Sequence, residues 1–141
     1  MNQAKEYLNQ IRTLDSKIAR RQQEIEELRT AAMSSGTQQL DEFKIRTDSP
    51  DPDPLATAVS RYVDMQKEVE EMILELTEMK HEVIGQISML DDARYMEVLW
   101  KRYVDLKSFG EIAEEMNYTL RHVTNLHGRA LQMFNEMFEF L

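Results

Sequence analysis

The sequence contains no cysteine, and it has only 4 glycines and 3 prolines among its 141 residues. Without cysteine, disulfides, thiolate metal sites and thiol nucleophiles are excluded, and we expect an intracellular protein. Few helix breakers and abundant Glu, Leu, Met, Lys, Gln and Arg predict an all-α protein. No uninterrupted apolar run approaches the roughly 20 residues that span a bilayer, so we expect no membrane partner.

Groups that could perform catalysis or bind a cofactor are also scarce. Of the three histidines, His122 and His127 lie five residues apart, which does not place them on one face of a helix. Asp48, Asp51 and Asp53 alternate with prolines, a poor calcium-loop pattern. The sequence has no glycine-rich phosphate loop and no nucleophile-elbow motif. We therefore expect no enzyme activity, no cofactor and no metal.

Residues 1–92 show the spacing of a coiled coil, with apolar residues three and four apart. We predict a long coiled-coil helical hairpin over 1–92, with a linker at 33–54 that contains the sequence DSPDPDP. Antiparallel packing is favoured because sequential helices usually form hairpins, although the linker length also permits a parallel pair. The predicted first seam is Ala4, Tyr7, Ile11, Leu14, Ile18, Arg21, Ile25, Leu28 and Ala32. The predicted second seam is Val59, Tyr62, Gln66, Val69, Ile73, Leu76, Lys80, Val83, Ile87 and Leu90.

Two features of these seams leave alternatives open. Met65, Met72 and Met79 recur every seven residues beside the second seam, and we interpret them as extra packing surface rather than a ligand groove. The polar seam residues Arg21, Gln66 and Lys80 either extend their charged or polar ends outward or fix the register of the pair. The apolar edge that remains predicts a homodimer.

Residues 109–128, with the sequence FGEIAEEMNYTLRHVTNLHG, fit a helix-turn-helix. Ala113 is the small residue needed where two helices approach, and Asn117 tolerates the positive φ that the turn requires. Ser108 and Glu111 form a capping-box pattern, and Thr119 is placed to cap the second helix. Residues spaced for burial between the helices are Ile112, Met116, Tyr118, Val123 and Leu126. The same pattern also occurs in a purely structural or protein-binding corner.

The charge distribution bears on nucleic-acid binding. The formal net charge is −9, whereas DNA-binding proteins usually carry a basic surface. Residues 1–92 hold 11 Lys and Arg against 19 Asp and Glu, while residues 93–141 hold 6 against 7, and residues 117–130 contain no acid. We therefore expect a locally positive second helix that binds double-stranded DNA weakly alone, and a partner that supplies further affinity.

The residues around this motif resemble sigma factor region four. The segment LWKRYVDLKSFGEIAEEM, followed by VTNLHGRAL, matches the pattern in which an arginine–tyrosine pair ends one helix and EIA opens the next. Nearly the whole chain also resembles phage and prophage proteins from low-GC Gram-positive bacteria, which are similar to phage late-gene transcription regulators. The residues that match the sigma region four pattern are Arg102, Tyr103, Glu111, Ile112, Ala113, Val123, Arg129, Ala130 and Leu131.

The resemblance implies roles for individual residues of the second helix. Thr119 matches the residue that meets a phosphate, and further side chains occupy positions that reach the major groove. Two positions depart from the sigma pattern. Leu120 stands where a polar residue is usual, and Leu126 with His127 reverses the usual order of a basic residue followed by an apolar one. The 141 residues include no match to the sigma regions that open promoter DNA, so we do not expect a complete sigma factor. The predicted DNA-binding residues are Thr119, Arg121, His122, Thr124, Asn125 and Arg129.

Two functions are consistent with these patterns. The first is a phage-encoded DNA-binding transcriptional regulator, non-enzymatic, in the cytoplasm of a bacterial host, with a helix-turn-helix domain at 93–141. The alternative is a protein-interaction adaptor or inhibitor whose acidic coiled coil binds host RNA polymerase or another bacterial protein, with a vestigial helix-turn-helix. We also expect the apolar tail to pack on the end of the second long helix near Ile87 and Leu90, or on a second chain, whereas a free tail would favour the adaptor. The tail residues are Phe134, Met137, Phe138, Phe140 and Leu141.

Overall fold

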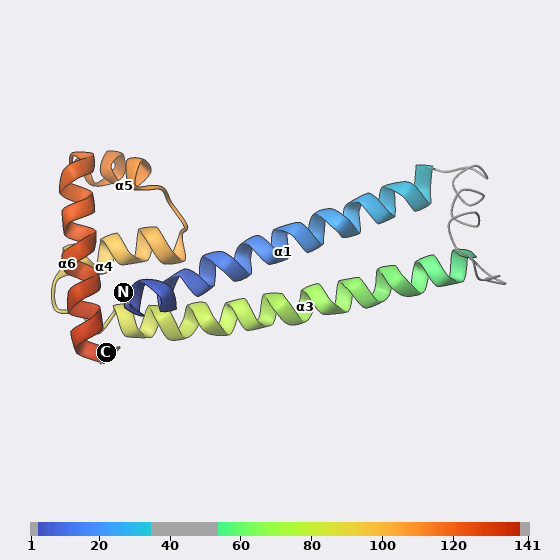
Figure 1. Cartoon of the computed structure of the whole chain (residues 1–141), viewed down its shortest axis with the longest axis horizontal. Helices are drawn as coiled ribbons and strands as arrows, with labels where there is room; N and C mark the ends of the chain where they lie inside the picture. Colours follow the sequence, from blue (N-terminus) through green and yellow to red (C-terminus); the bar gives the residue numbers. More distant parts are fainter. Residues whose placement is uncertain (1–2, 35–53, 139–141) are drawn as a thin grey trace. The chain divides into compact units, whose positions relative to one another are not determined.

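The computed structural model describes residues 3–34 and 54–138, and these residues are helical apart from short turns (Figure 1). The predicted all-α class is therefore confirmed. Most of the predicted linker, residues 35–53, and tail residues 139–141 lie outside the described residues. The helices are α1 (Gln3–Ser34), α3 (Pro54–Ile87), α4 (Ala93–Leu99), the π-helical segment η1 (Trp100–Val104), α5 (Phe109–Met116) and α6 (Leu120–Phe138).

The chain divides into two compact units, and both long helices pass through both of them. The first unit contains described residues 3–15 and 75–138, and the second contains 16–34 and 54–74. This division differs from the predicted boundary between residues 92 and 93, because the beginning of α1 and the end of α3 share a core with the C-terminal helices. Residues 93–141 alone would be too few to bury much surface, and the ends of α1 and α3 enlarge their core.

The core of the first unit is drawn from every helix of the unit. Tyr7 near the start of α1 donates a 2.7 Å hydrogen bond to Gln86 at the end of α3, so the two helices run antiparallel here (Figure 1). Arg12 reaches from α1 to the backbone of η1, donating to the Arg102 carbonyl at 3.2 Å. The largest fully buried side chains are Tyr103, Phe134, Leu8, Ile11, Ile87, Leu99, Ile112, Val83, Val98 and Val123.

The second unit is a pair of helical segments with a narrow seam. Ile18 and Val69 are its buried apolar side chains, and Arg21 is half-buried at a seam position. The Arg21 guanidinium lies 3.1 Å from Glu24 and 3.4 Å from Glu68 of α3. Arg21 therefore extends its charged end toward solvent and also pairs across the helices. An exposed pair of this kind contributes at most about 1 kcal/mol.

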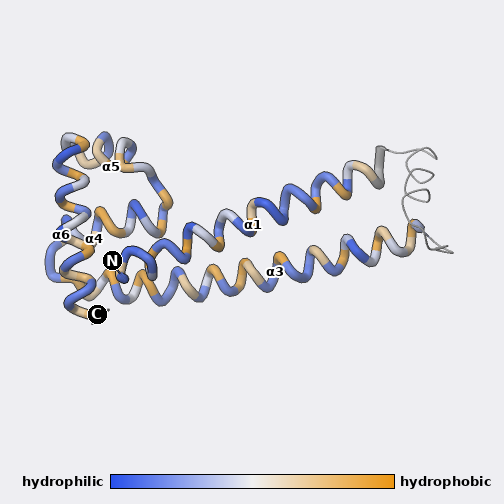
Figure 2. Tube along the Cα trace, in the orientation of Figure 1, coloured by the Kyte–Doolittle hydropathy of each residue, from blue (hydrophilic) through white to orange (hydrophobic). Residues whose placement is uncertain are grey.

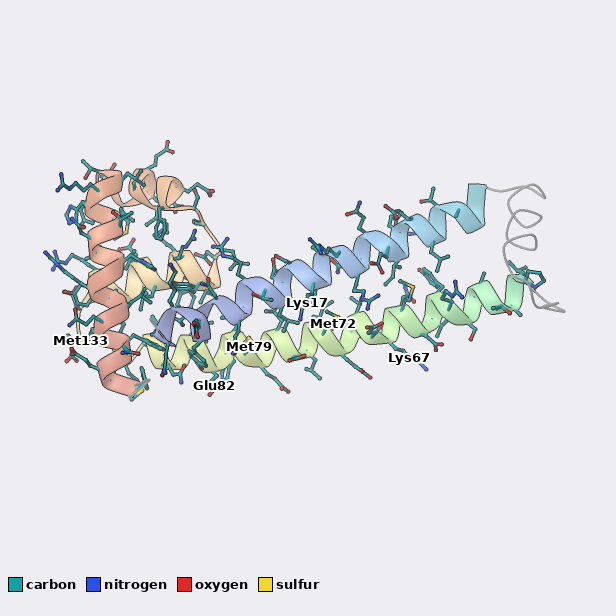
Figure 3. The ribbon with its side chains drawn as sticks, in the orientation of Figure 1. Lys17, Lys67, Met72, Met79, Glu82 and Met133 are labelled. Carbon is teal, nitrogen blue, oxygen red and sulfur yellow. The ribbon has the colours of Figure 1, made fainter. Side chains whose placement is uncertain are left out.

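The seam of α3 differs from the predicted one in alternate positions. Val59 is 53% exposed and Ile73 is 41% exposed, and Gln66 is exposed as well. Figure 3 shows Met72 and Met79 on the side of α3 that faces α1. The residues that line this side recur at alternating spacings of four and three: Ala58, Tyr62, Met65, Val69, Met72, Leu76, Met79 and Val83. The methionines thus belong to the seam itself, and the prediction that placed Val59, Gln66 and Ile73 there was wrong, whereas Lys80 is half-buried.

This shift leaves a second apolar stripe on α3, which we call the outer stripe. It consists of exposed side chains roughly a quarter-turn around the helix from the seam, and Figure 2 shows hydrophobic residues recurring along α3. The members of the outer stripe are Val59, Val63 and Ile73. Two further apolar side chains are exposed elsewhere on α3: Leu55, which continues the spacing of the seam, and Leu74, which lies nearly opposite it.

Among the described residues, no helix is both long enough and apolar enough to cross a bilayer.

Candidate nucleic-acid interface

The helix-turn-helix begins at Ser108, which caps α5. Its backbone is extended, and its Oγ accepts from the Glu111 backbone N–H at 3.2 Å. The Ser108 hydroxyl also lies 3.1 Å from the Glu111 carboxylate, to which it donates. The predicted N-cap is confirmed, but the capping box differs from its usual form, because the Glu111 carboxylate accepts from the Ser108 hydroxyl rather than from its backbone N–H. The two contacts fix where α5 starts.

The turn between α5 and α6 is a Schellman motif. Asn117 has φ 57° and ψ 42°, the left-handed conformation predicted for it. The backbone N–H of Tyr118 donates to Ala113 at 2.9 Å and that of Asn117 donates to Glu114 at 3.3 Å, which satisfies carbonyls left open at the helix end. Thr119 then caps α6, accepting from the His122 N–H at 3.1 Å. Local sequence therefore determines the corner.

The burial pattern across the corner largely follows the prediction. Ile112 and Val123 are fully buried, Leu126 is 3% exposed and Ala113 is 7% exposed. Met116 and Tyr118 are only half-buried. The Tyr118 ring instead stacks on His122 with a centroid separation of 4.2 Å. This stack holds one of the predicted DNA-contacting side chains against the turn.

Arg102, a residue matched by the sigma-like pattern, has a structural role here. It lies in η1, where the Asp105 N–H donates to the Trp100 carbonyl, a bond spanning five residues. Its guanidinium donates to the Lys107 carbonyl at 3.0 Å and lies 4.2 Å from the centroid of the Phe109 ring. Burial and the neighbouring Arg12 lower the pKa of Arg102. Arg102 thereby holds the start of α5 against η1.

His127, although on α6, is a core residue. It is 7% exposed, and its Nε2 lies 2.7 Å from the Tyr103 hydroxyl. Phe109 contacts the imidazole edge-to-face at 4.8 Å. Burial, followed by the charges of Arg102 and Lys5, lowers the pKa of His127 to about 4. His127 therefore packs inside the domain.

The lowered pKa of His127 predicts a pH dependence of stability. The unfolded chain protonates this histidine near its ordinary value of 6.5, whereas the folded chain does so only near 4. The stabilisation is therefore present above pH 6.5 and is lost as the pH falls through this window. Between pH 7 and pH 5 the unfolding free energy should drop by about 2 kcal/mol on this account.

Urea titrations at several pH values would measure this loss. The His127→Gln variant keeps a hydrogen-bond acceptor for Tyr103 but does not titrate, so it reports the contribution of the carboxylates alone. We expect a shallower pH dependence for the variant than for the wild type. Equal slopes would show that His127 is not held neutral by the fold.

The predicted DNA-binding residues all lie at the start of α6 or along it, and all are exposed. Arg121, Asn125 and Arg129 are spaced four residues apart and share one face of α6, opposite the buried Val123 and Ala130. Thr124 donates to the Arg121 carbonyl at 2.9 Å, and Thr119 is engaged as the cap. The structure thus brings the six residues together on one exposed surface, the α6 face: Thr119, Arg121, His122, Thr124, Asn125 and Arg129.

The arginines of the α6 face differ from the lysines near α5 in whether a carboxylate lies close to them. Within residues 3–34 and 54–138, neither Arg121 nor Arg129 has a carboxylate within salt-bridge distance. Lys107, by contrast, lies 2.5 Å from Glu115 of α5, and Lys101 lies 3.4 Å from the same carboxylate. These contacts lower the pKa of Glu115 and offset the negative charge of α5. A polyanion would therefore meet positive charge on α6.

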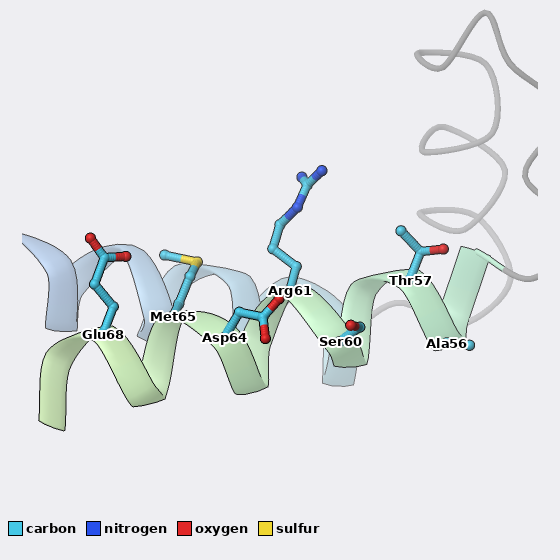
Figure 4. Close-up of a pocket in the computed structure, with 7 residues that line it drawn as sticks. All are labelled: Ala56, Thr57, Ser60, Arg61, Asp64, Met65 and Glu68. Carbon is cyan, nitrogen blue, oxygen red and sulfur yellow. The ribbon is translucent and has the colours of Figure 1, made fainter. Parts of the chain in front are cut away.

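A second surface feature is a shallow depression on α3 whose lining carries both acidic and basic side chains. It has a volume of about 530 Å³ and lies in the second unit, and its described lining comes from α3 alone (Figure 4). Arg61, Asp64 and Glu68 supply its charges, and Glu68 is also paired with Arg21. Among the described residues, no group of three or more His, Asp or Glu side chains could hold a metal ion. We assign no role to this depression.

Sequence reasoning missed one residue of the α6 face, Gly128, which is exposed in the middle of α6. The signal was a glycine inside an otherwise strong helical pattern, where it costs about 1 kcal/mol relative to alanine. Leu120, which departs from the sigma pattern, is 55% exposed at the first position of α6.

Comparison of the chain with protein-family models, curated proteins and solved structures gave no match.

Proposed function

We propose that this protein is a DNA-binding transcriptional regulator, encoded by a phage or prophage and active in the cytoplasm of its bacterial host. It is not an enzyme in this proposal. Its helix-turn-helix, which resembles sigma region four, presents the α6 face to the major groove of double-stranded DNA. Arg121 and Asn125 read base edges there, and Thr119 and Arg129 contact phosphates.

The observation that carries this proposal is the α6 face itself. Six polar or basic side chains are exposed together, and two of them are arginines without a carboxylate partner among the described residues. A helix of this kind on a capped, rigid corner has the geometry by which helix-turn-helix proteins read the major groove. The body of the protein is acidic, so few phosphates are neutralised and DNA binding alone is weak.

Selection of duplexes from a randomised pool, followed by fluorescence anisotropy on the enriched sequence, tests the proposal. Saturable, sequence-specific binding is expected at about 50 mM salt, where phosphate contacts are strongest. A scrambled duplex of the same length is the control. Absence of saturable binding to any selected duplex would refute the DNA-binding function.

A second candidate function is an adaptor that binds host RNA polymerase or another bacterial protein through the coiled coil. The observation that favours it is the outer stripe of α3, in which Val59 and Val63 are 53% and 40% exposed. The stripe is flanked by acids such as Glu70 and Glu71, which suit a basic partner. Binding to purified polymerase without any DNA binding would favour this function.

We further propose that the outer stripe joins two copies of the chain, and this predicts a homodimer. Apolar side chains exposed in a row lower the free energy when they are covered. Sedimentation equilibrium at micromolar concentration should give twice the 16.7 kDa chain mass. The Val59→Glu variant should shift the equilibrium to monomer, because it buries a charge in the contact, whereas Ser60→Glu beside it should not.

The dimer also constrains the DNA site. Two copies of α6 related by twofold symmetry would demand an inverted repeat with half-sites about one helical turn, or a multiple of it, apart. A wild-type protein that remains monomeric at about 100 µM contradicts the dimer, because a specific interface should be tighter than this.

A further inference from the structure

Gly128 lies in an unexpected position for a glycine. It is in the ninth position of α6, in the interior of a 19-residue helix, and it is exposed. Glycine destabilises a helix interior because it loses more conformational freedom on folding than any other residue. A glycine at this position therefore calls for a compensating role.

The two usual reasons for such a glycine are both missing in the described structure. The first reason is a left-handed backbone, but no glycine of the described residues has a positive φ. The second is close packing against another element, but a Cβ built on Gly128 meets no atom within 4 Å. The fold of the described chain would therefore accept alanine at this position without a clash.

The surroundings of Gly128 point to an anionic partner. Asn125 and Thr124 precede it by one turn on the same exposed face, and Gln132, whose amide donates to the Glu136 carboxylate at 3.5 Å, follows by one turn. Arg121 and Arg129, the arginines that lack a carboxylate partner among the described residues, lie on either side of it along the helix. A bare stretch of helix backbone between two cations and three hydrogen-bonding side chains is open to a bulky, negatively charged chain.

We propose that Gly128 is the point of closest approach between α6 and the sugar–phosphate backbone of duplex DNA. This inference rests on the proposed DNA-binding function. The missing side chain lets a DNA strand lie directly against the helix, which brings Arg121 and Asn125 within reach of the base edges and Arg129 within reach of a phosphate. A methyl group at residue 128 would hold the strand away from all three.

Alanine substitution separates this role from a structural one, because stability and binding should change in opposite directions. Gly128→Ala should raise the melting temperature by about 2–5 °C, since alanine favours helix. The same variant should weaken binding to the duplex selected by the wild type by about tenfold or more, comparable to losing one specific contact. Anisotropy and thermal unfolding on the full chain measure the two effects.

Gly85 provides a matched control. It is also exposed and a Cβ there also meets nothing within 4 Å, but it lies near the end of α3 and one turn after the acidic Glu82. Gly85→Ala should keep the wild-type affinity for DNA. Unchanged affinity of Gly128→Ala, a lowered melting temperature of that variant, or an equal loss of affinity in Gly85→Ala would each overturn the inference. Failure of the wild type to select any duplex would instead refute the proposed function.

Discussion

Replacing Phe134 by alanine is expected to lower the free energy of unfolding by about 3–5 kcal/mol, the range for a large aromatic side chain removed from a core. Phe134 is fully buried near the end of α6. Its ring lies 6.3 Å from that of Tyr7 on α1 and 4.7 Å from that of Phe138. The side chain therefore joins the last helix to the first within one core. Global stabilities of about 5–15 kcal/mol make such a loss severe.

Met133→Ala is the matched control, since this neighbour is 41% exposed and points outward from α6 (Figure 3). We expect it to cost less than about 1 kcal/mol, because an exposed side chain makes few contacts. Urea denaturation followed by circular dichroism measures both variants. A similar cost for the two substitutions would contradict the shared core of α1 and α6.

Removing a base-reading side chain from the α6 face should weaken specific DNA binding strongly. Arg121→Ala or Asn125→Ala is expected to cost about 1–3 kcal/mol on the selected duplex and to relax specificity at one base position. Both side chains are exposed, so their loss should leave the fold intact. Anisotropy against the selected duplex and its single-base variants measures affinity and specificity together.

Arg129 should behave differently, because we place it on a phosphate. Arg129→Ala should weaken binding to all duplexes to a similar degree and should reduce the slope of log affinity against log salt by about 1. Arg20→Ala on α1, another exposed arginine, is the control and should change neither quantity. Loss of specificity in Arg129→Ala, or none in Arg121→Ala, would reverse the assignment of roles.

The corner at 108–123 could be predicted from the sequence because local interactions determine it. Ser108, Asn117 and Thr119 act on backbone groups within five residues of themselves. Such caps depend little on the rest of the chain. The exposure of the six residues of the α6 face follows from the same register, since the opposite face carries the buried Val123 and Ala130.

The seam of α3 could not be predicted uniquely, because two heptad patterns overlap. Both contain Tyr62, Val69, Leu76 and Val83, and they differ by one residue at each alternate position, as where Ile73 or Met72 completes the alternation. Side-chain hydrophobicity favours isoleucine, but the direction from which α1 approaches decides the outcome. The flexible methionine side chain adapts to an irregular gap, which is consistent with its place in the seam.

The π-helical segment and its contacts could not be predicted from the sequence either. Val98, Leu99 and Tyr103 are buried, and their spacing in the sequence is typical of a helix. The widening at Trp100 accompanies a tertiary contact, in which Arg12 donates to the Arg102 carbonyl. Residues 90 apart in the chain make this bond, and no local pattern encodes it. The structural role of Arg102 became visible only with the fold.

Titration of isotopically labelled protein with its selected duplex, followed by amide chemical shifts, tests the central claim most directly. The proposal predicts that the largest shifts fall between residues 119 and 132, along the α6 face, while amides of α1 and α3 far from the corner change little. A scrambled duplex should give smaller shifts. Shifts concentrated on the outer stripe of α3, or no shifts at all, would contradict DNA binding by α6.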